Sequence, residues 1–174
     1  GKIEGINLPE TSVGFGETGK LYPEGFTPET YRNAIIEYMA MAKKAFHHSV
    51  VIQYANFMPG EWLPGNDKSY LKSLYEFASN EEIGMGGPDI KIYQKGHMNH
   101  GYKFLREYTN SITSGVAVQE GNYEEINPKT GKRVTVKEIY DFANDYLGLD
   151  YIFWCTQEPY YTDDLLPFLK ILSR

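Results

Sequence analysis

Short apolar runs alternate with amphipathic patterns along the chain. Five runs have the length and residue types of buried strands, and each ends at glycine, proline or polar residues. After each run, apolar residues recur three and four positions apart, which predicts an amphipathic helix. The predicted strands cover residues 2–8, 50–55, 83–90, 115–120 and 151–154.

Two of the predicted helices carry start signals. Thr27 precedes Pro28, which combines an N-capping hydroxyl with a proline that the first helical turn tolerates. Thr135 and Glu138 have the spacing of a capping box, and Gly148 fits the end of the same helix. Both helices therefore begin just before their apolar, periodic segments.

The repeated order of strand, loop and helix predicts an α/β fold with a mainly parallel sheet, because each helix returns the chain to start the next strand in the same direction. No linker-like stretch divides residues 1–174, which predicts a single α/β domain. Two arrangements of five βα units stay open. One is a partial (β/α)8 barrel, and the other is a flavodoxin-like, doubly wound five-stranded parallel sheet.

Composition and charge narrow the function classes. The chain has 174 residues, fewer than the roughly 250 of a complete eight-stranded barrel. Its net charge of −6 argues against a nucleic-acid partner, which requires a basic face. No apolar run approaches the roughly 20 residues that span a bilayer, so no membrane partner is expected. The single Cys155 excludes an intrachain disulfide and a cysteine-based zinc cluster.

Carboxylates, amides and aromatic rings follow each predicted strand. The carboxyl ends of parallel strands meet at one rim, where α/β folds place their sites. Glycoside hydrolysis needs two carboxyl groups, and aromatic rings pack against sugars. The alternative is that these are ordinary polar loop residues, with each Glu a helix cap or an ion-pair partner. The rim residues in question are Asn7, Glu10, Asn56, Glu61, Trp62, Asp89, Tyr93, Glu120, Asn122, Tyr123, Trp154, Gln157 and Glu158.

Three of these strand ends carry short motifs. Residues 7–10 (Asn-Leu-Pro-Glu), 118–121 (Val-Gln-Glu-Gly) and 153–155 (Phe-Trp-Cys) resemble the ends of strands four, seven and eight in the (β/α)8-barrel superfamily of retaining glycoside hydrolases, which includes cellulases and β-galactosidases. The resemblance implies that residues 1–174 correspond to strands four to eight of such a barrel. Pro9 departs from the family pattern, which usually has Asn directly before the acid/base Glu.

The resemblance implies retaining, double-displacement hydrolysis of a β-linked sugar. Glu120 would be the nucleophile and Glu10 the acid/base, with their carboxyl groups about 5–5.5 Å apart. Glu10 would need a raised pKa, from burial and a nearby negative charge. A periplasmic or extracellular location is suggested by the family alone. Trp154 would line the sugar subsite, as a Trp on strand eight does in the family. The positions at the rim add further candidate sugar-binding residues, which are Asn7, Asn56, Trp62, Asp89, Tyr93, His97, Tyr123 and Glu158.

Three other motifs have some features of a phosphate or metal site but lack others that such a site needs. Residues 14–20 match G-x-x-x-x-G-K by letter but lack the following Ser or Thr and an immediate helix. His97 and His100 lack a third metal ligand at suitable spacing. The glycines of residues 84–87 fit close backbone approach near a cleft better than a phosphate cradle. We therefore expect neither a cofactor nor a metal.

A non-catalytic carbohydrate-binding or assembly module fits the same rim without the chemistry. In either case, a partial barrel exposes two strand edges and part of an apolar core. The sequence therefore predicts a homodimer or pairing with a complementing barrel fragment, and the alternative is rearrangement into a closed smaller form.

Overall fold

The five strands form one sheet in a computed structural model that describes residues 3–13, 22–93 and 95–173, without the side chains of residues 95–100. The strand order is β1-β2-β3-β4-β5, and every neighbouring pair is parallel. The strands are β1 (Gly5–Leu8), β2 (Val50–Tyr54), β3 (Gly84–Gly87), β4 (Ser114–Val118) and β5 (Tyr151–Trp154).

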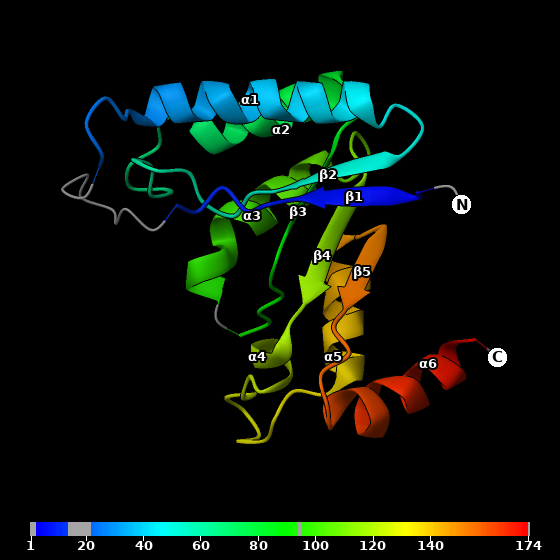
Figure 1. Cartoon of the computed structure of the whole chain (residues 1–174). Coiled ribbons are helices and arrows are strands. Elements are labelled where there is room, and N and C mark those ends of the chain that lie inside the picture. The colour runs from blue at the N-terminus through cyan, green and yellow to red at the C-terminus, as the bar shows by residue number, and fades with distance from the viewer. Residues whose placement is uncertain (1–2, 14–21, 94, 174) are drawn as a thin grey trace.

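Helical segments connect consecutive strands and follow the last one. The sheet curls, so that β1 and β2 run across the view in Figure 1 while β4 and β5 run down it. The helices α1 and α2 lie together above β1 and β2 in the same view. The helical segments are α1 (Pro28–Ala45), α2 (Tyr70–Asn80), α3 (Lys95–Tyr108), α4 (Glu120–Tyr123), α5 (Val136–Asp141), the π-helical turns η1 (Phe142–Leu147) and η2 (Tyr161–Leu165), and α6 (Leu166–Leu172).

The consecutive strand order distinguishes the two predicted arrangements. A flavodoxin-like sheet has the order 2-1-3-4-5 and reverses direction once, whereas this chain adds each strand to the same side of the previous one. Five βα units therefore form a curled half-barrel, and the partial-barrel prediction is confirmed.

The two expected helix starts are present. The Thr27 hydroxyl accepts a hydrogen bond from the Thr30 backbone N–H, and the Thr135–Glu138 capping box is complete. The predicted strand over residues 83–90 is shorter than expected, because Pro88 has no N–H to extend the ladder beyond Gly87.

The two faces of the sheet have different roles. Leu8, Val51 and Met85 belong to the hydrophobic core shared with the helices. Ile52 points to the opposite, concave face, and is nevertheless only 1 % exposed. A Cβ at Gly84 or Gly115 would lie 2.8 or 3.0 Å from the Ile52 side chain. Glycines in β3 and β4 therefore leave room for the Ile52 side chain on the concave face.

Both flanks of the half-barrel expose apolar helix surface. On the β1 side, Tyr38 and Met41 of α1 are 40 % and 63 % exposed. On the β5 side, Ile171 and Leu172 of α6 are 68 % and 46 % exposed, and α6 contains no buried residue. Within the described part of the chain, β1 and β5 each pair along one edge only. These surfaces are the ones that neighbouring βα units cover in a closed barrel.

Candidate functional site

Glu10 lies two residues beyond the end of β1, at the rim formed by the carboxyl ends of the strands. Burial raises the pKa of its carboxyl group, and the negative charge of Asp89 raises it further. A hydrogen bond from the Asn56 side chain favours the ionised form and opposes these two effects. The pKa of Glu10 is therefore raised, which is the expected direction, and the neighbouring negative charge is that of Asp89.

Asn56 follows β2 and is 3 % exposed. Its side chain occupies space that two glycines leave open. A Cβ at Gly87 would lie 2.7 Å from Asn56 Oδ1, and a Cβ at Gly101 would lie 2.8 Å from the same atom. Gly87 at the end of β3 and Gly101 in α3 therefore leave room for the Asn56 amide at the rim beside Glu10.

Asp89 connects the end of β3 to the end of β4. Asn122 donates a hydrogen bond from Nδ2 to Asp89 Oδ1 over 3.3 Å. The Oδ1 atom of Asn122 accepts from the backbone N–H groups of Gln119 (2.6 Å) and Ile90 (3.4 Å). Because Asn122 is fully buried, this amide is a fixed link between the two strand ends.

Glu120 is the first residue of α4 and is exposed. Its Oε1 accepts a hydrogen bond from Gln157 Nε2 over 3.3 Å, so the carboxylate joins the ends of β4 and β5. Asn122 belongs to the same short helix as Glu120. The turn that carries Glu120 is therefore anchored to Asp89, the residue whose charge acts on Glu10.

Three aromatic rings stack beyond β4 and β5. Tyr123 lies 6.4 Å from Trp154 and 5.1 Å from Tyr160, between ring centroids, in near-parallel arrangements. Tyr123 is 1 % exposed and donates its hydroxyl to the Cys155 carbonyl. Trp154 is partly buried and packs against the hydrophobic core. Tyr123 therefore supports Trp154 from within the protein.

Trp62 is the most exposed aromatic side chain among the predicted site residues, at 40 %. It stacks on Phe57 with centroids 5.8 Å apart and planes 9° from parallel. Its loop is fixed by the buried Glu61 carboxylate, which accepts backbone hydrogen bonds from the start of α2, including those of Tyr70 and Leu71. The pair Phe57–Trp62 is thus a flat aromatic surface on an anchored loop.

The remaining predicted residues have separate positions. The Tyr93 hydroxyl donates to Glu138 Oε1 over 3.4 Å. Glu158 accepts hydrogen bonds from the backbone N–H and the hydroxyl of Thr162, at the start of η2. The side chain of His97 lies outside the described residues.

One pair on the concave face was not predicted. Asn7 donates from Nδ2 to the Tyr54 hydroxyl over 2.9 Å, between β1 and β2. Burial raises the pKa of Tyr54 to about 12, so its hydroxyl stays protonated at neutral pH. Register explains the pairing, since Asn7 lies opposite Ile52 and Tyr54 follows two residues later on the same face. Because successive side chains of a strand point to opposite faces, the position of Tyr54 in the run 50–55 is the sequence signal for this pair.

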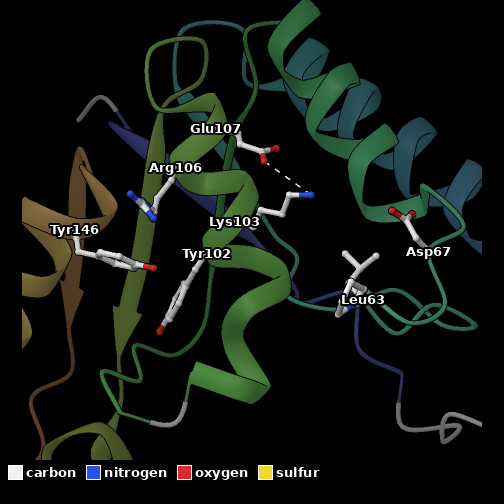
Figure 2. A pocket seen from close by; sticks show the side chains of 8 residues that line it. Leu63, Asp67, Tyr102, Lys103, Arg106, Glu107 and Tyr146 are labelled. Atoms are coloured by element: carbon white, nitrogen blue, oxygen red, sulfur yellow. Dashed lines mark ion pairs between the residues drawn. The ribbon is translucent and has the colours of Figure 1, made fainter.

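A pocket of about 560 Å³ lies along α3, and none of the predicted site residues lines it. Figure 2 shows Lys103, Arg106 and Glu107 of α3 between Tyr146 and the loop that carries Leu63 and Asp67. Lys103 pairs with Glu107 over 3.8 Å, and the Arg106 guanidinium lies 4.3 Å from the Tyr146 ring centroid. Two of the four charged side chains lining this pocket thus pair with each other, and a third, Arg106, lies over an aromatic ring.

Within the described ranges, no group of three His, Cys, Asp or Glu residues could hold a metal ion, and no described helix is long and apolar enough to cross a membrane. No family, curated protein or solved structure matches the chain. The rim geometry is therefore the basis for a functional proposal.

Proposed function

We propose that this chain is a glycoside hydrolase-like protein that hydrolyses a β-linked sugar by retaining double displacement. Glu10 acts as acid/base and Glu120 as nucleophile. The observation that carries the proposal is the environment of Glu10, a partly buried carboxyl group beside Asp89 with a raised pKa. A general acid must hold its proton near the working pH, and this environment favours the protonated form.

The two steps divide between the two carboxyl groups. Glu120 attacks the anomeric carbon, while Glu10 gives its proton to the departing glycosidic oxygen. Glu10 is then ionised, and in the second step it takes a proton from the water that releases the sugar from Glu120. The exposed, hydrogen-bonded carboxylate of Glu120 supports the nucleophile role, because it is accessible and oriented by Gln157.

The substrate-binding part of the proposal assigns rim residues to sugar hydroxyls and faces. Asn7, Asn56 and Asp89 offer amide and carboxylate groups, and the rings of Trp62 and Trp154 offer apolar faces for a pyranose. Tyr93, His97 and Glu158 complete the proposed contacts, and the buried Tyr123 supports the ring of Trp154 without reaching the sugar. The anchored surface made by Phe57 and Trp62 supports this assignment most directly.

The decisive experiment uses aryl β-glycosides and their 2-deoxy-2-fluoro analogues. We expect turnover that is lost in Glu120→Gln, and covalent labelling that maps to Glu120 by peptide mass spectrometry. NMR of the first-formed product should show retained anomeric configuration. Labelling at Asp89 would reassign the nucleophile, and inversion of configuration would contradict the double-displacement mechanism.

A non-catalytic carbohydrate-binding or assembly module is the second candidate. The exposed Trp62 ring on its anchored loop favours it, because a stacking surface binds sugar without any acid or nucleophile. Sugar binding without turnover, in every assembly state, would establish this candidate and contradict the enzyme.

We also propose that a second copy of the chain or a complementing barrel fragment covers the open flanks. The exposed apolar side chains Tyr38, Met41, Ile171 and Leu172 support this, since they belong to helices that follow the two edge strands, β1 and β5. Light scattering of the wild type and of Met41→Glu/Ile171→Glu tests the homodimer. We expect the wild type to have a mass above the 19.9 kDa of one chain, and the variant to have a lower mass. A wild type that is already monomeric, with the same mass as the variant, would contradict the homodimer.

A further inference from the structure

Gln53 is a fully buried polar residue in the otherwise apolar strand β2. Its Nε2 donates to the Pro9 carbonyl over 2.6 Å and to the Tyr54 carbonyl over 2.9 Å. Its Oε1 is buried without a hydrogen-bond partner among the described residues. Turning the amide over would bring Oε1 against two carbonyl oxygens, so the side chain serves as a donor at this position.

The Pro9 carbonyl belongs to the peptide group that joins Pro9 to Glu10. The next peptide group is also held, because the Thr11 N–H donates to the Tyr54 carbonyl over 3.2 Å. Both peptide planes beside the Cα atom of Glu10 are therefore fixed to β2. The Tyr54 carbonyl accepts from Gln53 and from Thr11, which joins the two contacts at one atom.

Thr11 is fixed at its other groups as well. It is fully buried, and its hydroxyl donates to the Phe57 carbonyl over 2.5 Å. Its carbonyl accepts from the Tyr31 hydroxyl of α1 over 3.1 Å. The segment after β1 is thus held from β2, from the following loop and from α1.

Pro9 explains why side chains hold this segment. Regular pairing of β1 with β2 ends at Leu8, which lies opposite Gln53. Proline has no N–H for a further ladder bond, so the chain leaves the strand here. Gln53 supplies a different contact between the two segments, a bond from its side chain to the Pro9 carbonyl.

We propose that Gln53 and Tyr31 are positioning residues for Glu10, which hold residues 9–11 so that the Glu10 carboxyl group stays against Asn56 and Asp89. Neither side chain needs to contact the substrate. The positioning itself follows from the backbone contacts, whereas its effect on turnover rests on the proposed function.

The test combines NMR titration of the Glu10 carboxyl carbon with kinetics on an aryl β-glycoside. The variants are Gln53→Met, which keeps the side-chain shape without a donor, and Tyr31→Phe, which removes one hydroxyl. Tyr38→Phe is the matched control, because Tyr38 lies on the same helix and is exposed. Titration needs only folded protein, so it reports on positioning whether or not the wild type turns over substrate.

We expect the Glu10 pKa to fall toward 4.5 in Gln53→Met and Tyr31→Phe, because the freed carboxyl group gains solvent, and to stay at the wild-type value in Tyr38→Phe. We expect kcat to fall by about ten- to a hundredfold, with a smaller change in KM. If the Glu10 titration is unchanged in both variants and only the melting temperature falls, the contacts stabilise the fold without positioning Glu10. That result would overturn the inference. A shifted titration with unchanged kcat would uphold positioning and contradict Glu10 as the acid/base.

Discussion

The carboxyl group of Glu10 lies within electrostatic reach of Asp89, although 79 positions separate them in the sequence (89 − 10). Each belongs to a different strand end, and the parallel sheet brings the two ends to the same rim. Burial and this neighbour act on Glu10 in the same direction, since both disfavour its charged form. The pair links the fold to the proposed acid/base chemistry.

Replacing Asp89 with Asn removes the charge and keeps the shape of the side chain. We expect the pKa of Glu10 to fall, because one of the two effects that raise it is gone. The alkaline limb of the kcat/KM pH profile should move to lower pH, since that limb reports loss of the general acid's proton. Carboxyl NMR titration measures the first effect directly. Asp163→Asn, at an exposed position, is the control and should leave both unchanged.

Stability should depend on pH through Glu10. Its pKa is higher in the folded protein than the ordinary 4.5, so the folded state favours the protonated form. Ionisation therefore lowers the stability of the folded protein as the pH rises through and above 4.5, and the deficit is complete once the pH exceeds the folded-state pKa. Glu10→Gln should raise the melting temperature at pH 7, and the gain should shrink below about pH 4. An equal effect at both pH values would contradict the raised pKa.

Gly101→Ala should disturb the rim from a distance. The added Cβ would lie 2.8 Å from Asn56 Oδ1, so the buried amide must move. Glu10 then loses the hydrogen bond that favours its ionised form, and its pKa should rise further. We expect overpacking to cost about 1–3 kcal/mol in urea unfolding, partly offset by alanine's better helix propensity. Gly65→Ala is the control, because its Cβ would meet no atom closer than 4.0 Å; a similar loss there would reject the packing explanation.

The two tryptophans should respond differently to truncation. Trp62→Ala removes an exposed ring, so we expect oligosaccharide affinity to fall by about tenfold with little change in melting temperature. Trp154→Ala removes a ring that packs against the core and Tyr123, so the melting temperature should fall as well. Isothermal titration calorimetry and thermal unfolding separate the two effects. Equal loss of stability in both variants would contradict this division.

Local patterns predicted the five strands and the main helices, although the strand expected over residues 83–90 ends at Gly87. The apolar runs at residues 50–55 and 151–154 and the caps at Thr27 and Thr135 rely on contacts between near neighbours, and the structure contains each of them. The βα alternation predicted a parallel sheet for the same reason, because a helix between two strands sets their relative direction. The candidate rim also followed from this direction, since parallel strands share a carboxyl edge.

Tertiary structure decided the order of the strands in the sheet and the neighbours of the rim side chains. The choice between a half-barrel and a doubly wound sheet depends on which edge each new strand joins, which the local pattern leaves open. The neighbours of Glu10, and the hydrogen bond from Gln53 to Pro9 across 44 positions, depend on strand register and loop packing. The need for glycine at positions 87 and 101 is visible only in the folded protein, where the Asn56 side chain lies close to both. Sequence alone thus determined the elements and the rim that holds polar residues, whereas long-range packing determined which carboxyl group is buried beside another.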